Sequence, residues 1–226
     1  MSLDALGERA AALVEDGTVV GLGSGRAASG FVRALGARVR GGLAVRGVPT
    51  SRDTARLAAS LGIPLTDLTA EPLDLAVDGA DEVDPHLDLI KGYGGALVRE
   101  RIVAAASRQR VILAGADKLV ETLGTRGRLP VEVVPFAAAF VAGRLAALGL
   151  RPALRVDAGG APVASDNGNR ILDCGTAPIP DAAALHRAVR EIPGVVDTGL
   201  FLGVADLVLV ADEGGVRELR RTPPRL

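Results

Sequence analysis

The chain has 226 residues, of which 48% are hydrophobic and 23% charged, so it can bury a core and is not typical of disordered proteins. Lysine and arginine number 26 against 27 acidic residues, and only 2% of residues are aromatic, which argues against binding to nucleic acid or membranes. The single cysteine, Cys174, excludes an intrachain disulfide and disfavours a cysteine metal site. The acidic, amphipathic N-terminus is unlike a signal peptide, and no apolar run approaches the roughly 20 residues of a membrane span. We therefore expect a soluble cytoplasmic protein.

The first half of the chain alternates strand-like and helix-like segments. The predicted strands are 18–22, 43–48, 73–77 and 111–115, and the predicted helices are 26–38, 52–61 and 95–107. This alternation predicts an α/β fold with a doubly wound, mostly parallel, Rossmann-like sheet. Because ligands bind beyond the carboxyl ends of strands in such sheets, the loops that follow these strands are expected to gather at one edge.

The pattern changes after about residue 127. The elements predicted there are a strand at PVEVVP, a helix at 136–149, short strands at PALRV, APVAS and RILDC, and a helix at DAAALHRAVREI. Short strands grouped near helices predict a second, smaller α+β domain. The apolar segment 205–211 is typical of a buried parallel strand that returns to the first sheet. The expected division is a Rossmann-like catalytic domain over 1–127 and 203–226, and an α+β domain over 128–202.

The first loop, GLGSGRAA, connects a predicted strand to a helix. From Gly23 it matches the loose dinucleotide pattern G-x-G-x-x-A, but that site also requires an acid at the end of the second strand. Here Pro49, Thr50 and Ser51 occupy that place, which disfavours nicotinamide binding. Two interpretations remain, an anion site formed by backbone N–H groups at the helix start and a tight turn without a ligand.

Acids are concentrated in the stretch LAVDGADEVDPHLDLIKGYGGALVRE, residues 75–100. Asp84 before Pro85 indicates turn chemistry, whereas Asp78 directly follows the apolar strand and is less easily explained as a solvated turn. Lys91 and a glycine-rich loop come next, and they can stabilise a developing enolate oxygen. Glu100 falls early in a helix, where the helix dipole favours its ionised form and makes it a usable general base.

These parts together suit proton abstraction next to a carbonyl on a phosphorylated substrate. No nucleophile, redox group or metal-ligand set is evident in the sequence. The two histidines, His86 and His186, are far apart and are interpreted as surface residues. We therefore expect neither a metal nor a cofactor.

The sequence motifs of this chain resemble those of a known family, the type A ribose-5-phosphate isomerases. The resemblance rests on DGADEVD, LIKGYGGALVRERI, ADK at 116–118, LPVEVVP, SDNGNRILD and IPGVVDTGLF, which keep their order from about residue 18 to 202. It implies metal-free interconversion of ribose 5-phosphate and ribulose 5-phosphate in the pentose phosphate pathway. It also implies a homodimer or homotetramer with no other partner than the phosphosugar.

The resemblance assigns residues to roles. The catalytic residues would be Glu100 as proton acceptor, with Asp78, Asp81 and Lys91. The substrate would contact Ser24, Gly25, Arg26, Ala27, Asp78, Gly79, Ala80, Asp81, Lys91, Gly92, Tyr93, Gly94 and Lys118. In two places this chain departs from the family. Arg26 and Ala27 replace a hydroxyl pair, and Tyr93 interrupts the family's KGGG loop. Tyr93 would be strained if its φ were positive, and it would narrow the site if its side chain pointed inward.

Two other functions compete with the isomerase. A sugar-phosphate sensor domain of a transcriptional regulator is disfavoured because the chain starts only about one helix before the first strand, leaving no DNA-binding segment. A coenzyme A transferase would use a glutamate as nucleophile, and hydroxylamine would trap its thioester intermediate.

Overall fold

A computed structural model describes residues 3–221 of the chain. Contacts divide the chain into two compact units. Unit 1 comprises Met1–Ala80, Arg99–Leu119 and Gly203–Leu226, and unit 2 comprises Asp81–Val98 and Val120–Leu202. Residues 81–98 and 120–127, expected in the first domain, thus make their contacts within unit 2. The expected domain limits, 1–127 with 203–226 and 128–202, stay a prediction of which parts of the chain fold independently.

Unit 1 is built around a six-stranded sheet. In sheet order its strands are β13 (Gly215–Arg220), β12 (Leu207–Asp212), β6 (Ser107–Gly115), β3 (Leu73–Gly79), β1 (Val19–Leu22) and β2 (Arg46–Pro49). All neighbouring strands are parallel except β12 and β13, which pair antiparallel. The carboxyl ends of β1, β2, β3 and β6 therefore share one edge of the sheet, as predicted, and the segment predicted at 205–211 returns to this sheet.

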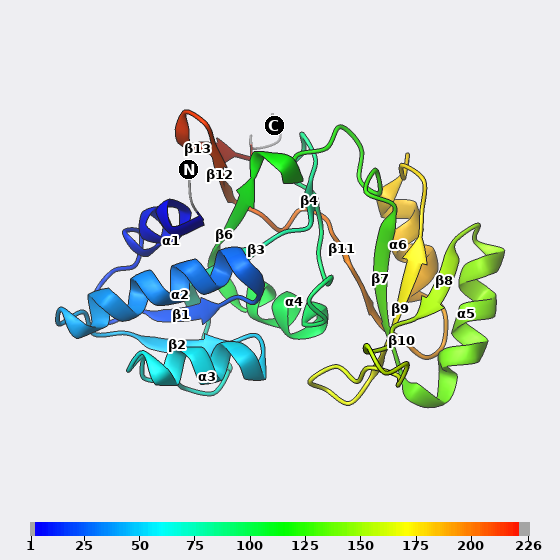
Figure 1. Ribbon diagram of the computed structural model, residues 1–226, viewed down its shortest axis with the longest axis horizontal. Coiled ribbons are helices and arrows are strands. Elements are labelled where there is room, and N and C mark those ends of the chain that lie inside the picture. The colour runs from blue at the N-terminus through cyan, green and yellow to red at the C-terminus, as the bar shows by residue number, and fades with distance from the viewer. Residues whose placement is uncertain (1–2, 222–226) are drawn as a thin grey trace. The chain divides into compact units, whose positions relative to one another are not determined.

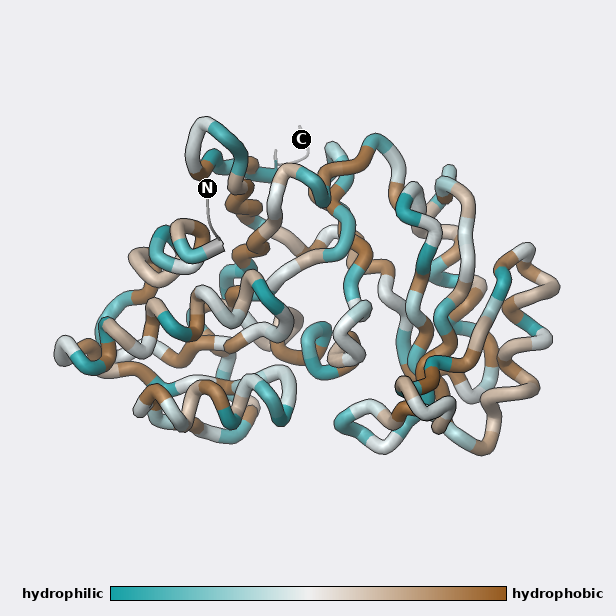
Figure 2. The backbone as a smooth tube through the Cα atoms, viewed as in Figure 1, coloured by the Kyte–Doolittle hydropathy of each residue, from teal (hydrophilic) through white to brown (hydrophobic). Residues whose placement is uncertain are grey.

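Helices cover both faces of this sheet (Figure 1). They are α1 (Leu3–Ala11), α2 (Gly25–Arg40), α3 (Arg52–Ser60) and α4 (Leu97–Ala105), the last within unit 1 from Arg99. Leu75 and Val77 of β3 join a core cluster with Phe31 of α2, whereas Ala76 between them packs with Val103 of α4. This alternation explains why residues 75–77 are apolar without a break, since both faces of the strand are buried there. Figure 2 shows the same continuous hydrophobic colouring along β12.

Helices α1 and α2 pack closely because Gly7 lacks a side chain. A Cβ there would lie 2.5 Å from the carbonyl carbon of Gly30 and 2.7 Å from the nitrogen of Phe31, which are backbone atoms that cannot yield without separating the helices. We expect Gly7→Ala to lower the free energy of unfolding by about 1–3 kcal/mol, measured by urea denaturation. Gly143→Ala, in a helix of unit 2 where nothing lies within 4 Å, should raise it by about 0.5–1 kcal/mol. Equal effects of the two substitutions would show that helix contact is not the cause.

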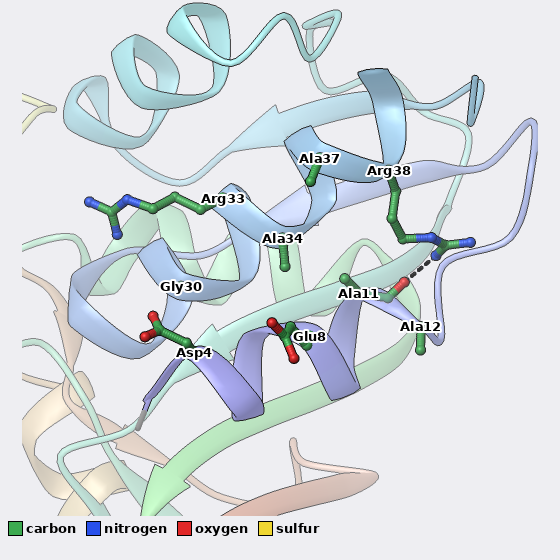
Figure 3. Close-up of a pocket in the computed structure, with 9 residues that line it drawn as sticks. All are labelled: Asp4, Glu8, Ala11, Ala12, Gly30, Arg33, Ala34, Ala37 and Arg38. Atoms are coloured by element: carbon green, nitrogen blue, oxygen red, sulfur yellow. Dashed lines mark hydrogen bonds between the residues drawn. The ribbon is translucent and has the colours of Figure 1, made fainter. Parts of the chain in front are cut away.

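A surface pocket of about 640 Å³ lies along α1 and α2 (Figure 3). Its floor is small residues such as Ala11 and Ala34, with Asp4 and Glu8 on α1 and Arg33 on α2. Arg38 donates to the carbonyl oxygens of Ala11 and Val14, at the C-terminus of α1, where a cation is favoured. None of the predicted site residues lines this pocket, so its size is unrelated to the candidate site.

Unit 2 contains a four-stranded antiparallel sheet, in the order β10, β7, β9, β8. The bounds are β10 (Val195–Thr198), β7 (Arg128–Val133), β9 (Arg170–Gly175) and β8 (Arg151–Leu154). The helices are α5 (Ala138–Ala147) and α6 (Ala182–Arg190), with the 3-10 turn η2 (Pro135–Ala137), and a small sheet joins β11 (Leu200–Phe201), β5 (Leu89–Ile90) and β4 (Glu82–Val83). This arrangement confirms the predicted smaller α+β part.

Alternate residues of β7 face opposite sides of this sheet. Leu129, Val131 and Val133 are buried in a cluster with residues of α5 and α6, so Arg128 and Glu132 face the other side. The prediction of a strand at APVAS was wrong. That segment makes only an isolated bridge, between Val156 and Pro162, because the chain turns on both sides of it. The Gly160 N–H donates to the Asp157 carbonyl before it, and the Gly168 N–H donates to the Ser165 carbonyl after it. In residues 3–221, no helix has the length and apolar character that crossing a membrane requires.

Candidate active site

The predicted site residues fall into two groups, one in each unit. Unit 1 holds Ser24, Gly25, Arg26, Ala27, Asp78, Gly79, Ala80, Glu100 and Lys118. Unit 2 holds Asp81, Lys91, Gly92, Tyr93 and Gly94.

In unit 1, the loop after β1 is fastened to the end of β3 by Asp78. This carboxylate is buried, and its Oδ1 accepts the N–H groups of Ser24, at 3.0 Å, and of Gly79, at 2.7 Å. Gly23 permits the approach, because a Cβ there would lie 2.3 Å from Asp78 Oδ1 and 2.5 Å from its Cα. Asp78 therefore fixes the backbone conformation of the predicted anion-binding loop.

A cluster of hydroxyl groups lies at the carboxyl ends of β1 and β2. Ser24 Oγ is 2.8 Å from Thr50 Oγ1, donates to Ser51 Oγ at 2.8 Å, and is 3.2 Å from Thr54 Oγ1. Ser51 also caps α3 by accepting the N–H group of Thr54. The Ser24 hydroxyl is thus held by the protein itself, and Thr50 and Ser51 share this place with it.

Arg26 and Ala27, the two departures in this loop, occupy the first turn of α2. The Arg26 side chain is exposed, and Ala27 is half-buried against the unit 1 core. Arg26 therefore stands at a helix N-terminus with its guanidinium accessible, where an anion is favoured.

Glu100 lies in the first turn of α4, as predicted, and is only 7% exposed. At this position the N-terminal end of the helix dipole favours the carboxylate over the carboxylic acid. Burial also keeps most of this side chain out of bulk water. Position and burial therefore both suit a general base.

Lys118 ends η1 (Ala116–Lys118), the turn that follows β6, and its Nζ lies 3.5 Å from Asp117 Oδ2. Lys91 and Lys118 are the only lysines in the chain, whose other basic side chains, apart from histidine, are arginines. A lysine ammonium is a compact point charge that an arginine fork does not replace. Both lysines belong to the predicted site.

In unit 2, Asp81 and Lys91 are brought together by β4 and β5. The Asp81 N–H donates to the carbonyl of Ile90 at 2.8 Å, and the Lys91 N–H donates to the carbonyl of Gly199 at 2.9 Å. Asp81 Oδ2 in turn accepts the N–H group of Tyr93 at 2.9 Å. Lys91 is 4% exposed, and its Nζ lies 5.6 Å from the centre of the Phe201 ring, within reach of a cation–π contact.

Tyr93 fits the glycine loop without strain. Gly92 beside it takes a positive φ of 104°, whereas Tyr93 does not. The tyrosine ring lies 4.6 Å from the Arg128 guanidinium, and its hydroxyl donates to the Arg128 carbonyl at 3.2 Å. The side chain therefore packs on the face of the antiparallel sheet, and only its backbone follows the loop.

The environment of Tyr93 predicts an alkaline titration that can be measured. Burial, followed by the charges of Glu82 and Asp81, raises the pKa of Tyr93 to about 12 from an ordinary 10.0. A raised pKa contributes stability that is fully present below pH 10 and is lost as the pH rises through about 12. Because Tyr93 is the only tyrosine, absorbance of the phenolate should give a midpoint near 12 in the folded protein and near 10 in urea. A folded midpoint near 10 would contradict this packing.

Two acids of the predicted cluster have structural roles. Glu82 is fully buried and accepts the N–H groups of Gly124, at 2.6 Å, and Arg126, at 2.8 Å, so it shapes that turn. Asp84 Oδ1 accepts the N–H groups of His86 and Asp88, each at 2.9 Å, which confirms the predicted turn chemistry. Among residues 3–221, no group of three or more histidine, cysteine or acidic side chains is placed to hold a metal ion.

Comparison with known proteins identifies the family. The family model of ribose 5-phosphate isomerase A (phosphoriboisomerase A) matches residues 46–215. A ribose-5-phosphate isomerase A from Roseiflexus castenholzii is 54% identical, with 94% of this chain and 92% of the relative covered. The chain belongs to the ribose 5-phosphate isomerase A family.

Solved structures agree with this assignment. Ribose 5-phosphate isomerase A from Methanocaldococcus jannaschii superposes with a TM-score of 0.92 at 41% identity, covering 96% of this chain and 98% of that one. A D-ribose-5-phosphate isomerase in complex with phospho-erythronic acid gives a TM-score of 0.93 at 36% identity, covering 97% of each chain. The fold class and the recognised family predicted from the sequence are therefore confirmed.

Some residues that the structure places beside the predicted site are not among the predicted ones. The hydroxyls of Thr50, Ser51 and Thr54 follow β2, and the rule that ligands bind at the carboxyl ends of parallel strands would have included them. The contacts that support Tyr93 come from β7 and from the residues after β8, far away in sequence. No motif spacing within the glycine loop indicates such long-range contacts.

Proposed function

We propose that Glu100 is the general base through which the protein, an aldose–ketose isomerase, interconverts D-ribose 5-phosphate and D-ribulose 5-phosphate in the pentose phosphate pathway. The observation that carries this proposal is the burial of Glu100 in the first turn of α4 in a chain of this family. Glu100 would remove the proton from C2 of the open-chain aldose, leaving an enediolate, and would return it to C1. The matching proton moves from the C2 hydroxyl to the oxygen at C1, so the aldehyde becomes an alcohol and C2 becomes the ketone.

The other candidate residues are proposed to bind the substrate and stabilise the charge that develops. Lys91, with the N–H groups of the Gly92–Gly94 loop, would stabilise the enediolate oxygens, since donors fixed before the reaction need no reorganisation. Asp78 and Asp81 would assist ring opening of the sugar. The loop 23–27 and Lys118 would hold the phosphate at the N-terminus of α2. Gly79 and Ala80 would line the sugar at the end of β3.

Arg26 is proposed to replace the family's hydroxyl pair as a phosphate ligand, because a guanidinium binds phosphate with two hydrogen bonds. We expect Arg26→Ala to raise KM for ribose 5-phosphate by about 5–150-fold with kcat nearly unchanged, as for the loss of one charge-assisted contact worth about 1–3 kcal/mol. Arg33→Ala, on the same helix but in the pocket of Figure 3, is the control. An unchanged KM for Arg26→Ala would remove Arg26 from the phosphate site.

The family match favours the isomerase over the sugar-phosphate sensor and the coenzyme A transferase. We also propose a cytoplasmic protein that forms a homodimer or homotetramer, as the resemblance implies. Phe136, fully exposed, and Phe140, 55% exposed, support self-association because they lie four residues apart in an apolar stretch. Light scattering should give two or four times the chain mass of 23.0 kDa, and a mass of one chain would refute the oligomer.

A further inference from the structure

A partly buried charge network in unit 2 lies against the glycine loop. Asp173 of β9 accepts two hydrogen bonds from Arg128 of β7, each at 2.9 Å. It also accepts two from Arg155, which follows β8, at 2.9 and 2.6 Å. Burial by itself would raise the pKa of Asp173, but hydrogen bonds from Arg155 and Arg128 hold it below its ordinary value. The Asp173 carboxylate therefore binds each of the two guanidinium groups through two hydrogen bonds, and this pairing fixes the orientation of each guanidinium plane.

Arg155 extends this network to the loop. Its side chain is only 11% exposed, and it donates to the carbonyl oxygens of Gly92 and Tyr93, both at 3.1 Å. One guanidinium thus binds Asp173 and two consecutive carbonyls of the loop at the same time. These are four hydrogen bonds, which the five N–H donors of an arginine's planar fork can make and the three of a lysine ammonium cannot.

These two carbonyl contacts set the direction of the loop's N–H groups. In a trans peptide the C=O and N–H point to opposite sides, so a carbonyl held by Arg155 turns the next N–H away from it. The Gly92–Tyr93 peptide shows the result, because its carbonyl binds Arg155 while its N–H donates to Asp81 Oδ2. In the next peptide, the Gly94 N–H is turned away from Arg155 in the same manner.

We propose that Arg155, held by Asp173, is a positioning residue for the isomerase reaction, which fixes the peptide planes of the lysine–glycine loop and orients the carboxylate of Asp81. This inference rests on the role given above to Lys91, Asp81 and the loop. Arg155 itself does not touch the substrate. It acts by keeping the loop's N–H donors in place before the substrate binds, and misplacing such donors slows the chemical step more than it weakens binding.

The test compares Arg155→Lys with Arg151→Lys, a control in β8 whose exposed arginine makes one weak contact, with Thr176 O at 3.5 Å. We expect Arg155→Lys to lower kcat by roughly 10–100-fold with KM changed by less than about threefold, and Arg151→Lys to leave both unchanged. Thermal unfolding of each variant confirms that it is folded at the assay temperature. A folded Arg155→Lys with kcat within about twofold of wild type would overturn the proposal.

A second variant separates positioning from general stability. In Arg155→Ala, added guanidinium at millimolar concentration should restore part of kcat, because the free cation can bind Asp173 and both carbonyls. Restoration without a rise in melting temperature supports positioning, whereas no restoration in a folded variant argues for a structural role only. The Lys91→Met variant, measured under the same conditions, separates the proposed role of Lys91 and the loop from the positioning role of Arg155. If Lys91→Met lowers kcat and Arg155→Lys does not, the role of Arg155 is rejected and the proposed function stands. If Lys91→Met is fully active, the role proposed for Lys91 and the glycine loop is rejected.

Discussion

Replacing Glu100 with glutamine is expected to lower kcat for ribose 5-phosphate by about 10²–10⁴-fold, with KM much less affected. Glutamine has nearly the same shape as glutamate, but its amide does not accept a proton at neutral pH. The loss should therefore fall on the proton transfer and not on substrate binding. The kcat/KM values of the two directions should fall by the same factor, because their ratio equals the equilibrium constant between the two sugars, which is independent of the enzyme.

The control for this variant is Glu191→Gln, an exposed glutamate at the C-terminus of α6 that has no role in the proposed site. Melting temperatures of both variants should be compared, because Glu100 is buried and its replacement changes the interior of unit 1. A folded Glu100→Gln enzyme with near-normal turnover would assign the base to another residue.

Replacing Lys91 with methionine is expected to lower kcat by about 10²–10³-fold, the range found when one donor to a developing oxyanion is removed. Methionine keeps the length and apolar stem of the side chain next to Phe201 and removes only the ammonium group. Because Lys91 is 4% exposed, an apolar replacement of similar volume should be tolerated by the fold.

Lys118→Met provides the contrast, since the chain has no lysines other than these two. Lys118 is proposed to bind the phosphate, which is present in both ground state and transition state, so its loss should raise KM more than it lowers kcat. If the two substitutions lower kcat and raise KM by the same factors, the separate roles given to the lysines are wrong.

The sequence predicted the parallel sheet well because its signals are local. The segment LDLAV is apolar except for Asp74, since β3 is buried on both faces over most of its length, and glycines and acids mark where the strand ends. The return of the last strand could be predicted for the same reason. The mostly apolar segment APVAS indicates a strand, but turns on both sides limit it to one bridge, at Pro162.

The candidate residues were found from motifs, but the contacts that hold them could not be read from the sequence. Tyr93 illustrates this. The sequence indicated strain or a narrowed site, whereas the side chain packs on Arg128, 35 residues away. Arg155 is 63 residues from Gly92, and its role depends on the order of strands in the antiparallel sheet. Pairing between distant strands is a tertiary property that local propensity does not specify.

The most direct test of the account is a crystal structure of this protein with phospho-erythronic acid, the ligand present in one solved relative. The carboxylate of this acid has the planar carbon that an enediolate also has. We expect a carboxylate oxygen of Glu100 within about 3.5 Å of that planar carbon or its neighbour, and Lys91 Nζ within about 3.2 Å of an oxygen on it. The phosphate should contact the 23–27 loop. A complex in which Glu100 lies more than roughly 6 Å from the reacting carbons would contradict the assignment of Glu100 as the base.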